Sequence, residues 1–294
     1  MLGDVKMTLQ QQDVGRSKIA LPEPWRCAVV TVVLPTYNES SNLPLIVEAL
    51  FSLPLTGLRI LVADDNSPDG TGHTADQLAK QYGYDRMMVV HRPCKQGLGR
   101  AYVDGISRAV RGGAEFVVQM DSDLSHGPEY VPQMLDTMLS TGADVVVGSR
   151  YVAGASVADE WSWHRKMLSS FANTYVRAVL RLGIRDVTAG FKLWRSSALE
   201  AIDIASIRSN GYSFQVEMNY RSVEHGLKLV EIPIHFTERR EGVSKMNLRV
   251  QLESALMPFL LRYRALMLRS LKSVGQASGG ATLHQLRHGA DPRG

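Results

Sequence analysis

Hydrophobic runs of strand length alternate along the chain with amphipathic segments of helix length, beginning near Ala28. The first run, AVVTVVL, is mostly β-branched, and the segment after it opens with turn residues and continues with helical spacing. The alternation repeats in four further runs, which are LRILVAD, RMMVVH, AEFVVQM and ADVVVGS. These units predict a doubly wound α/β fold, in which helices cover both faces of a mainly parallel sheet.

The pattern is looser beyond Tyr151. A polar and aromatic loop leads into a helix expected from about Lys166 to Leu182, and LKLVEIPIHF predicts another strand. The stretch from Asn247 to Val274 has the pattern of one amphipathic helix with a kink near Pro258. The basic residues that lie away from its apolar face are Arg249, Arg262, Arg264, Arg269 and Lys272.

The chain shows no internal repeat, so one domain is the simplest partition. We expect a flexible lead-in over residues 1–27 and a single domain over residues 28–247. An amphipathic helical segment over residues 248–273 is expected to pack on the domain or on a membrane surface. Residues 274–294 are expected to form a disordered tail.

Composition narrows the class of protein without identifying it. The 294 residues, 45% of them hydrophobic, suffice for a sizeable core, and a net charge of +4 suits an anionic ligand or a membrane surface without requiring either. Cys27 and Cys94 stand far apart, which argues against a disulfide framework and favours a reducing, cytosolic setting. The chain has no apolar window long enough to span a membrane and no apolar signal-peptide core at its start. We therefore expect a cytosolic protein whose membrane contact is peripheral.

Polar residues follow the hydrophobic runs at the carboxyl ends of the expected strands, where open α/β sheets bind their ligands. The first run leads into PTYNE, the second into DDNSPDG, the fourth into DSD and the fifth into GSR. Three strand ends thus bring acidic side chains to one rim of the sheet.

Asp121 and Asp123 stand one residue apart directly after the fourth hydrophobic run. Side chains at i and i+2 can point the same way, and their charges then repel unless a cation or hydrogen-bond donors neutralise them. Mg²⁺ or Mn²⁺ suits such a pair, because these ions take oxygen ligands and share carboxylates with substrate phosphates. An Asx turn that caps a helix near Pro128 explains the pair equally well in isolation. The second acidic turn, at Asp64 and Asp65, favours a nucleotide and metal site.

Other local motifs carry weaker signals. The glycines of Gly97-Leu98-Gly99 lack the third glycine of a phosphate-binding loop and are expected to serve a close contact between helix and sheet. His126 is expected to be a hydrogen-bonding surface residue without a catalytic role. Basic residues after strand ends or in loops are candidates for phosphate counter-charges. They are Arg150, Arg165, Lys166, Arg239, Arg240 and Lys245.

Eight segments in order resemble the family 2 glycosyltransferases of GT-A fold: VVLPTYNES, LVADDNSPDG, RPCKQGLGRA, QMDSDLSHGPE, VVGSRY, DVTAGFKLWR, GYSFQVEM and ERREGVSKM. More narrowly, the chain resembles polyprenol- and dolichol-phosphate mannose synthases of the actinobacterial type, which lack transmembrane helices. The resemblance implies transfer of mannose from GDP-mannose to a polyprenyl monophosphate with Mg²⁺ or Mn²⁺. It also implies a place at the cytosolic face of a membrane, with room for a membrane-anchoring protein partner and no nucleic acid.

The resemblance assigns roles to individual residues. Donor-binding residues would be Pro35, Tyr37, Glu39, Ala63, Asp65, Asp121, Ser122, Asp123, Arg150, Gln215, Arg239 and Lys245. Among these, Asp65 would contact the base, and Gln215 stands where some relatives carry lysine. Asp121, Asp123 and Arg150 would be catalytic.

The metal and the acceptor phosphate have their own expected ligands. Asp121 and Asp123 would bind the metal, and Ser125 stands where some relatives have glutamine, so that Ser125 or a water would complete the metal's ligands. Arg165 and Ser169 would bind the acceptor phosphate.

The chemistry of the acceptor decides whether a general base is needed. A phosphate monoester is largely ionised near pH 7, because its second pKa is about 6, and it can attack the anomeric carbon without a strong base. Hydroxyl acceptors need a carboxylate base, for which Asp186 is the one evident candidate. Single displacement would invert the sugar and give β-mannosyl phosphoryl polyprenol. Two alternatives stay open: a polyprenyl-phosphate glucosyltransferase that uses a UDP-sugar, and a non-catalytic subunit that binds a nucleotide sugar.

Overall fold

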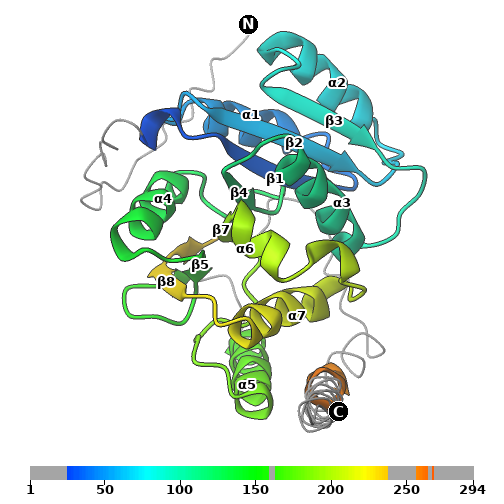
Figure 1. The fold of residues 1–294 in the computed structure, drawn as a ribbon. Coiled ribbons are helices and arrows are strands. Elements are labelled where there is room, and N and C mark those ends of the chain that lie inside the picture. The colour runs from blue at the N-terminus through cyan, green and yellow to red at the C-terminus, as the bar shows by residue number, and fades with distance from the viewer. Residues whose placement is uncertain (1–24, 159–162, 238–255, 264–266, 268–294) are drawn as a thin grey trace, which may run out of the picture.

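The computed structural model describes residues 25–158, 163–237, 256–263 and 267 (Figure 1). Its centre is a seven-stranded sheet in the order β3-β2-β1-β4-β7-β5-β8. The strands are β1 (Val30–Thr36), β2 (Leu58–Asp64), β3 (Met87–His91), β4 (Phe116–Gln119), β5 (Val145–Ser149), β7 (Lys192–Arg195) and β8 (Leu229–Pro233). All run parallel except β7, which is antiparallel to both of its neighbours, β4 and β5.

The five strands predicted from hydrophobic runs are confirmed, and β8 lies within the predicted strand LKLVEIPIHF. Strand β7 was not predicted. It has four residues, begins with a lysine, and enters the sheet between two strands that precede it in the sequence. Such a pairing between distant segments leaves no trace in the local alternation of strands and helices.

Helices cover both faces of the sheet, as the α/β pattern predicts. On one face lie α1 (Leu43–Phe51), α2 (Thr71–Tyr82) and α4 (Tyr130–Thr141), and on the other lie α3 (Leu98–Arg111), α6 (Ser196–Ala201) and α7 (Gly211–Glu224). In β1, Val32 and Leu34 pack on the first face whereas Val33 packs on the second, which is the two-residue period of a strand buried on both sides.

Close packing of α3 depends on two glycines. A Cβ on Gly105 would approach Val33 Cγ1 of β1 to 2.6 Å, so Gly105 makes the close contact between helix and sheet. A Cβ on Gly99 would instead clash with the backbone at Ser209 and Asn210, just before α7. The prediction that Gly97-Leu98-Gly99 makes the close contact with the sheet is therefore wrong, because Gly99 contacts the segment before α7.

The second half of the chain adds elements beside the main sheet. Strands β6 (Ser156–Val157) and β9 (His235–Phe236) form a separate parallel pair, and α5 (Trp163–Leu180) is the helix expected near Lys166. Short 3-10 helices lie at Trp25–Cys27 and Ile204–Ser206. Within the described ranges, none of the helices combines the length and apolar character needed to cross a bilayer.

Of the helix predicted over residues 247–274, the structure describes residues 256–263, which are helical, and residue 267. Leu261 is buried in one hydrophobic cluster with Val176 and Leu180 of α5 and Val216 of α7. This part of the segment therefore packs on the domain. The lead-in as far as residue 24 and the tail over 274–294 lie outside the described residues.

Candidate functional site

A cavity of about 380 Å³ opens at the carboxyl ends of the parallel strands. It lies where the chain order reverses, with β2 and β3 on one side of β1 and β4 on the other, and open α/β sheets bind ligands at such points. Most of the predicted donor-binding residues line this cavity. They are Pro35, Tyr37, Glu39, Asp65, Asp121, Ser122, Asp123, Arg150 and Gln215.

Some predicted site residues do not line the cavity. Ala63 is fully buried inside β2 and Ser125 is 1% exposed. Ser169, on α5, makes a 2.7 Å hydrogen bond with the hydroxyl of Tyr151. Arg239, Lys245 and the side chain of Arg165 lie outside the described residues, so their roles stay predictions.

Asp121 follows β4 and is oriented by the helix beside it. The hydroxyl of Tyr102, from α3, donates to Asp121 Oδ1 over 2.7 Å. Burial raises the pKa of Tyr102 well above its usual value, and the charge of Asp121 adds to this, so the phenol stays protonated. Among the described residues, nothing donates to Asp121 Oδ2, which remains available to a ligand in the cavity.

Asp123 forms the Asx turn that the sequence suggested as an alternative. Its Oδ1 accepts hydrogen bonds from Ser125 N at 3.1 Å and from Ser125 Oγ at 2.6 Å. Leu124 between them has φ +62°, a left-handed conformation that costs energy for a branched residue. The turn caps no helix, because α4 begins only at Tyr130, and it places Asp123 in the cavity wall.

His126 is not the surface residue that its Gly-Pro neighbours suggested. It is 3% exposed, lines the cavity, and stacks against Phe191 with ring centroids 5.2 Å apart. Burial lowers its pKa despite the nearby charges of Asp121 and Asp123, so the ring is neutral at pH 7. Its Nδ1 accepts the backbone N–H of Asp121 at 3.3 Å, and the ring therefore supports the turn.

Arg150 follows β5 and is held by a buried carboxylate. Its Nε and Nη2 donate to the two oxygens of Asp186 at 2.8 Å each, and Nη2 also donates to Thr188 Oγ1 at 2.8 Å. Burial alone would raise the pKa of Asp186, but Arg150 outweighs it and holds that pKa below its usual value. Asp186 is fully buried and does not line the cavity, so it is badly placed to act as a base.

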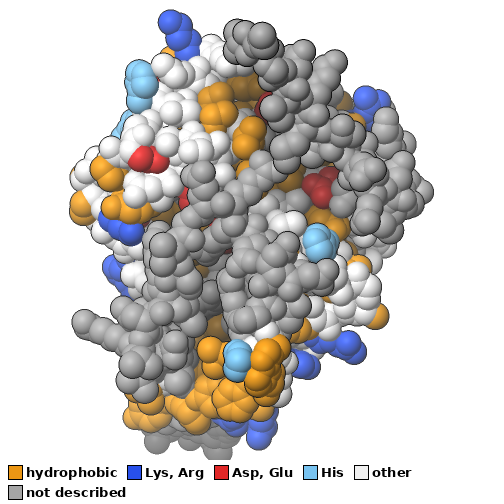
Figure 2. Space-filling view, turned by 180° about the vertical axis from the view of Figure 1, so that it is seen from behind, with side chains coloured by type: hydrophobic (Ala, Val, Ile, Leu, Met, Phe, Trp, Pro, Cys, Tyr) orange, Lys and Arg blue, Asp and Glu red, His pale blue; other side chains and the backbone are white. Residues whose placement is uncertain are grey.

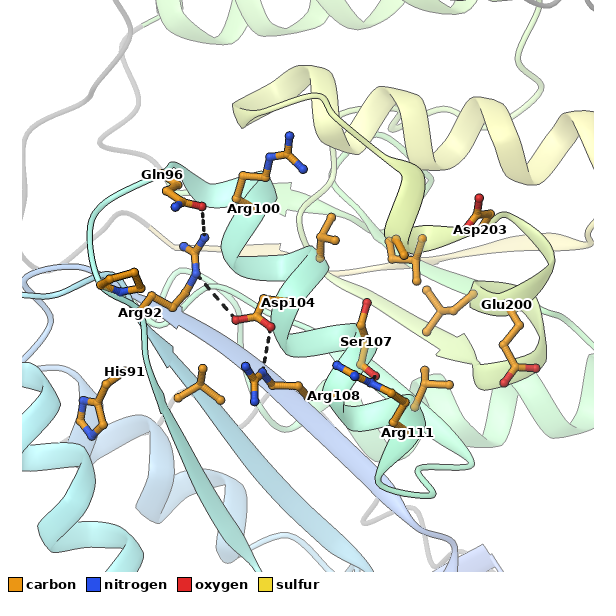
Figure 3. A pocket seen from close by; sticks show the side chains of 17 residues that line it. His91, Arg92, Gln96, Arg100, Asp104, Ser107, Arg108, Arg111, Glu200 and Asp203 are labelled. Carbon is orange, nitrogen blue, oxygen red and sulfur yellow. Dashed lines mark hydrogen bonds and ion pairs between the residues drawn. The ribbon is translucent and has the colours of Figure 1, made fainter.

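Asp65 follows β2 and pairs with a buried arginine. Arg92 Nη1 donates to Asp65 Oδ1, and both side chains are 6% exposed. Arg92 Nη2 also donates to Gln96 Oε1 at 3.0 Å, and its Nε lies 3.9 Å from Asp104 Oδ2 (Figure 3). Arg92 lines a second, open groove of about 860 Å³ between α3 and α6, whereas its partner Asp65 lines the cavity.

The neighbouring carboxylate, Asp64, accepts hydrogen bonds from residues of β1 and of its own turn. Its Oδ1 accepts from Thr36 Oγ1 at 3.0 Å and from Ser67 Oγ at 2.5 Å, while Oδ2 accepts from Ser67 N at 3.1 Å. Asp64 is thus stabilised by neutral donors and Asp65 by the charge of Arg92, and of the two only Asp65 lines the cavity.

The loop after β1 supplies the opposite wall. Lys95 Nζ lies 3.4 Å from the centroid of the Tyr37 ring, a cation–π contact that holds the ring beside the cavity. Glu39 Oε2 accepts from Asn42 Nδ2 at 2.8 Å. Pro35 contributes its carbonyl, which accepts from Ser122 Oγ at 2.9 Å and ties β1 to the aspartate turn.

Sequence reasoning missed Tyr102, Arg92, Thr188 and Lys192. Each acts through a residue that is distant along the chain, which no local spacing reveals. The available signal was their position inside the motifs RPCKQGLGRA and DVTAGFKLWR or directly after them. The part of the chain that the structure describes contains no cluster of three or more His, Cys, Asp or Glu side chains placed to hold a metal.

An open α/β sheet with paired carboxylates and an arginine at its topological switch point defines a protein class that binds ligands at the carboxyl edge. The chain belongs to glycosyl transferase family 2, whose model matches residues 31–203. The protein is thus a glycosyltransferase by family.

Two relatives are similar over most of the chain. The polyprenol monophosphomannose synthase of Mycolicibacterium smegmatis is 48% identical over 216 residues, which are 74% of this chain and 80% of the relative. The undecaprenyl-phosphate mannosyltransferase of Micrococcus luteus is 42% identical over 219 residues, 74% of this chain and 87% of the relative.

Solved structures with low sequence identity share the fold. The glucosyl-3-phosphoglycerate synthase of Mycobacterium tuberculosis, in complex with Mn²⁺, UDP and glucosyl-3-phosphoglycerate, has a TM-score of 0.55 at 17% identity, with 82% of this chain and 79% of that chain covered. The mannosyl-3-phosphoglycerate synthase of Rubrobacter xylanophilus has a TM-score of 0.55 at 17% identity, with 83% and 75% covered. These matches confirm the predicted GT-A fold.

Proposed function

We propose that this glycosyltransferase moves mannose from GDP-mannose to a polyprenyl monophosphate, with inversion, and releases GDP. The names of the two similar relatives support the sugar and the class of acceptor. The observation that carries the proposal is that Asp121, Asp123 and Arg150 line one cavity at the switch point of the sheet. A nucleoside diphosphate needs this combination of metal ligands and cationic counter-charge.

The carboxylates fit a divalent ion. Tyr102 orients Asp121 through Oδ1, Oδ2 accepts no hydrogen bond from the described residues, and Asp123 lines the same cavity two residues on. Mg²⁺ and Mn²⁺ are bound through one or two carboxylates together with substrate phosphates, which suits so small a donor set. When bound, such an ion would neutralise charge on the leaving diphosphate. The M. tuberculosis enzyme, which shares the fold, was solved in complex with Mn²⁺ and UDP, and this supports a divalent ion here.

The buried pair of Arg150 and Asp186 bears on the acceptor. Both oxygens of Asp186 accept hydrogen bonds from Arg150, and Asp186 does not line the cavity. It is therefore not positioned to act as a general base. An acceptor that arrives already ionised, such as a phosphate monoester, requires none. What remains for the protein is to hold donor and acceptor in line and to stabilise the leaving group.

An apolar surface on the second half of the chain suits an acceptor with a lipid tail. Trp163, Met167, Leu168 and Phe171 of α5 are more than half exposed, and so are Leu256, Phe259, Leu260 and Tyr263 of the C-terminal helical residues. The rings of Tyr175 and Phe259 lie 6.2 Å apart, which joins the two sets. Figure 2 shows hydrophobic side chains gathered at this lower end of the molecule. We call these eight residues the apolar surface and propose that it contacts the cytosolic face of a membrane.

One basic residue of the C-terminal amphipathic segment has a partner within the protein. Arg262 Nη1 donates to the carbonyl of Val179 at 2.7 Å and so ties the C-terminal helical residues to α5. Membrane contact in the proposal therefore depends on the apolar side chains more than on Arg262.

The experiment is a transfer assay with the full chain, Mg²⁺ and a polyprenyl phosphate, using radiolabelled GDP-mannose in one reaction and UDP-glucose in another. Labelled lipid is expected from GDP-mannose alone. Asp123→Asn should abolish transfer at unchanged melting temperature, whereas Asp136→Asn, on the exposed side of α4, should keep it. Label from UDP-glucose, or full activity of Asp123→Asn, would refute the donor or the metal assignment respectively.

A further inference from the structure

A buried chain of hydrogen bonds lies beside the cavity and involves two residues outside its lining. Gln119 Nε2 donates to Gln215 Oε1 at 2.6 Å, and Lys192 Nζ donates to the same oxygen at 2.8 Å. Gln119 on β4 and Lys192 on β7 are fully buried. Gln215, on α7, is 3% exposed and lines the cavity. These hydrogen bonds therefore connect buried residues to a residue of the cavity lining.

These contacts determine which way the Gln215 amide points. Protonated Lys192 has donors only, so in that state the atom of Gln215 that faces it is the oxygen. The second donor, from Gln119, occupies the other side of the same oxygen. The amide nitrogen of Gln215 is left with its two N–H groups, and among the described residues it has no acceptor. Gln215 belongs to the lining of the cavity, so a ligand oxygen there can accept from these N–H groups.

The charge behind this amide points to the kind of oxygen. Lys192 makes no hydrogen bond to a carboxylate in the described part of the chain, and the acidic group that acts on it, Asp186, is engaged by Arg150. Burial lowers the pKa of Lys192 to about 7, against the opposing effect of Asp186. A buried cation with little compensation is stabilised by an anion nearby, and a diphosphate is the anion that this cavity is proposed to hold.

We infer that Gln215 donates its amide N–H to an anionic oxygen of the bound nucleoside diphosphate, and that Lys192 is the positioning residue that fixes this orientation and adds a buried counter-charge. The inference rests on the proposed function only in taking a nucleoside diphosphate as the ligand. It does not depend on the base or on the sugar.

The test measures binding without turnover. Calorimetry with the full chain and Mg²⁺ gives the Kd of GDP and, separately, of UDP for the wild type, Gln215→Leu and Lys192→Met. Both variants are expected to raise the Kd of whichever nucleotide binds by about tenfold or more, as for lost hydrogen bonds to a charged group. Lys228→Met is the matched control, because Lys228 is exposed and precedes β8, at the end of the sheet opposite the cavity. The Kd of this variant should equal that of the wild type.

A second readout separates positioning from a merely structural role. At pH 8 the wild type should take up protons when nucleotide binds, since an anion favours the charged form of Lys192, and the uptake should be smaller in Lys192→Met. Comparing calorimetric heats in buffers of different ionisation enthalpy measures this uptake. Equal uptake in both proteins would overturn the role of Lys192.

A third variant keeps the test decisive if Lys192→Met does not fold. Gln215→Glu preserves shape and can pair with Lys192, but it presents an oxygen in place of the N–H groups. It should weaken nucleotide binding at least as much as Gln215→Leu. Unchanged Kd in both Gln215 variants would overturn the inference. Failure of both nucleotides to bind the wild type would refute the proposed function and the inference together, whereas nucleotide binding without mannosyl transfer would refute the proposed function alone.

Discussion

Tyr102 on α3 donates its hydroxyl to Asp121 Oδ1 at the end of β4, over 2.7 Å. The ring of Tyr102 also stacks on Phe214 of α7, with centroids 5.8 Å apart and planes 2° from parallel. A single fully buried side chain thus joins two helices to the aspartate turn.

Tyr102→Phe is expected to weaken metal dependence without unfolding the protein. The ring stack remains, whereas Asp121 loses a hydrogen bond to a charged acceptor that contributes about 1.5 kcal/mol. The Mg²⁺ concentration for half-maximal transfer should rise about tenfold. Tyr84→Phe, at a position 68% exposed, is the control. An unchanged metal requirement in Tyr102→Phe would show that the hydroxyl does not orient Asp121.

Asp186→Asn should act on stability and on Arg150 rather than on proton transfer. Removing one charge of a buried ion pair costs about 3 kcal/mol or more, so urea denaturation should show a lower free energy of unfolding. The remaining activity should keep the pH dependence of the wild type, because Asp186 is not the base. Asp76→Asn, whose carboxylate is 53% exposed, should change neither quantity. Loss of an acidic limb from the pH–rate profile in Asp186→Asn alone would reinstate Asp186 as a base.

Lys192 should make the stability of the ligand-free protein depend on pH. Its pKa falls from 10.5 to about 7 on burial, so between these values the unfolded chain binds a proton that the folded chain does not. Stability from this group therefore rises with pH through that window, and its full cost is present below pH 7. Urea denaturation at pH 6, 7.5 and 9 should show the largest advantage of Lys192→Met over the wild type at pH 6. Parallel profiles for the two proteins would contradict the burial of a titrating ammonium.

We expect the protein to bind anionic phospholipid vesicles through the apolar surface. The double variant Phe171→Ser with Phe259→Ser removes two rings that are 70% and 55% exposed, one from each helical part. Vesicle flotation should recover several-fold less of this variant than of the wild type, because less apolar area enters the interface. Tyr84→Ser serves as the control, since Tyr84 is similarly exposed but lies before β3. Equal flotation of all three proteins would refute membrane contact through this surface.

The sequence allowed the fold to be predicted wherever the determinants were local. Strands such as β1 and β5 are largely apolar runs, and the aspartates at 121 and 123 follow closely on another, β4. Residues whose surroundings come from elsewhere in the chain were misjudged. His126 has the neighbours of an exposed turn, yet Phe191 and Phe236 bury it from distant segments. Lys192 was not singled out from the sequence, because its neighbours Gln119 on β4 and Gln215 on α7 are not visible in its own motif.

Successive side chains around β7 point to opposite faces of the sheet, so the length of the segment from Asp186 to Lys192 affects the site. Phe191 and Leu193 pack on the face of the sheet covered by α4, whereas Trp194 packs on the face covered by α7. Lys192 reaches Gln215 because it alternates with these neighbours. Insertion or deletion of one residue between Asp186 and Lys192 would shift the alternation, turning an apolar side chain toward Gln215 and the ammonium toward the opposite core. In this chain, the number of residues between Asp186 and Lys192 thus determines whether the ammonium reaches Gln215 at all.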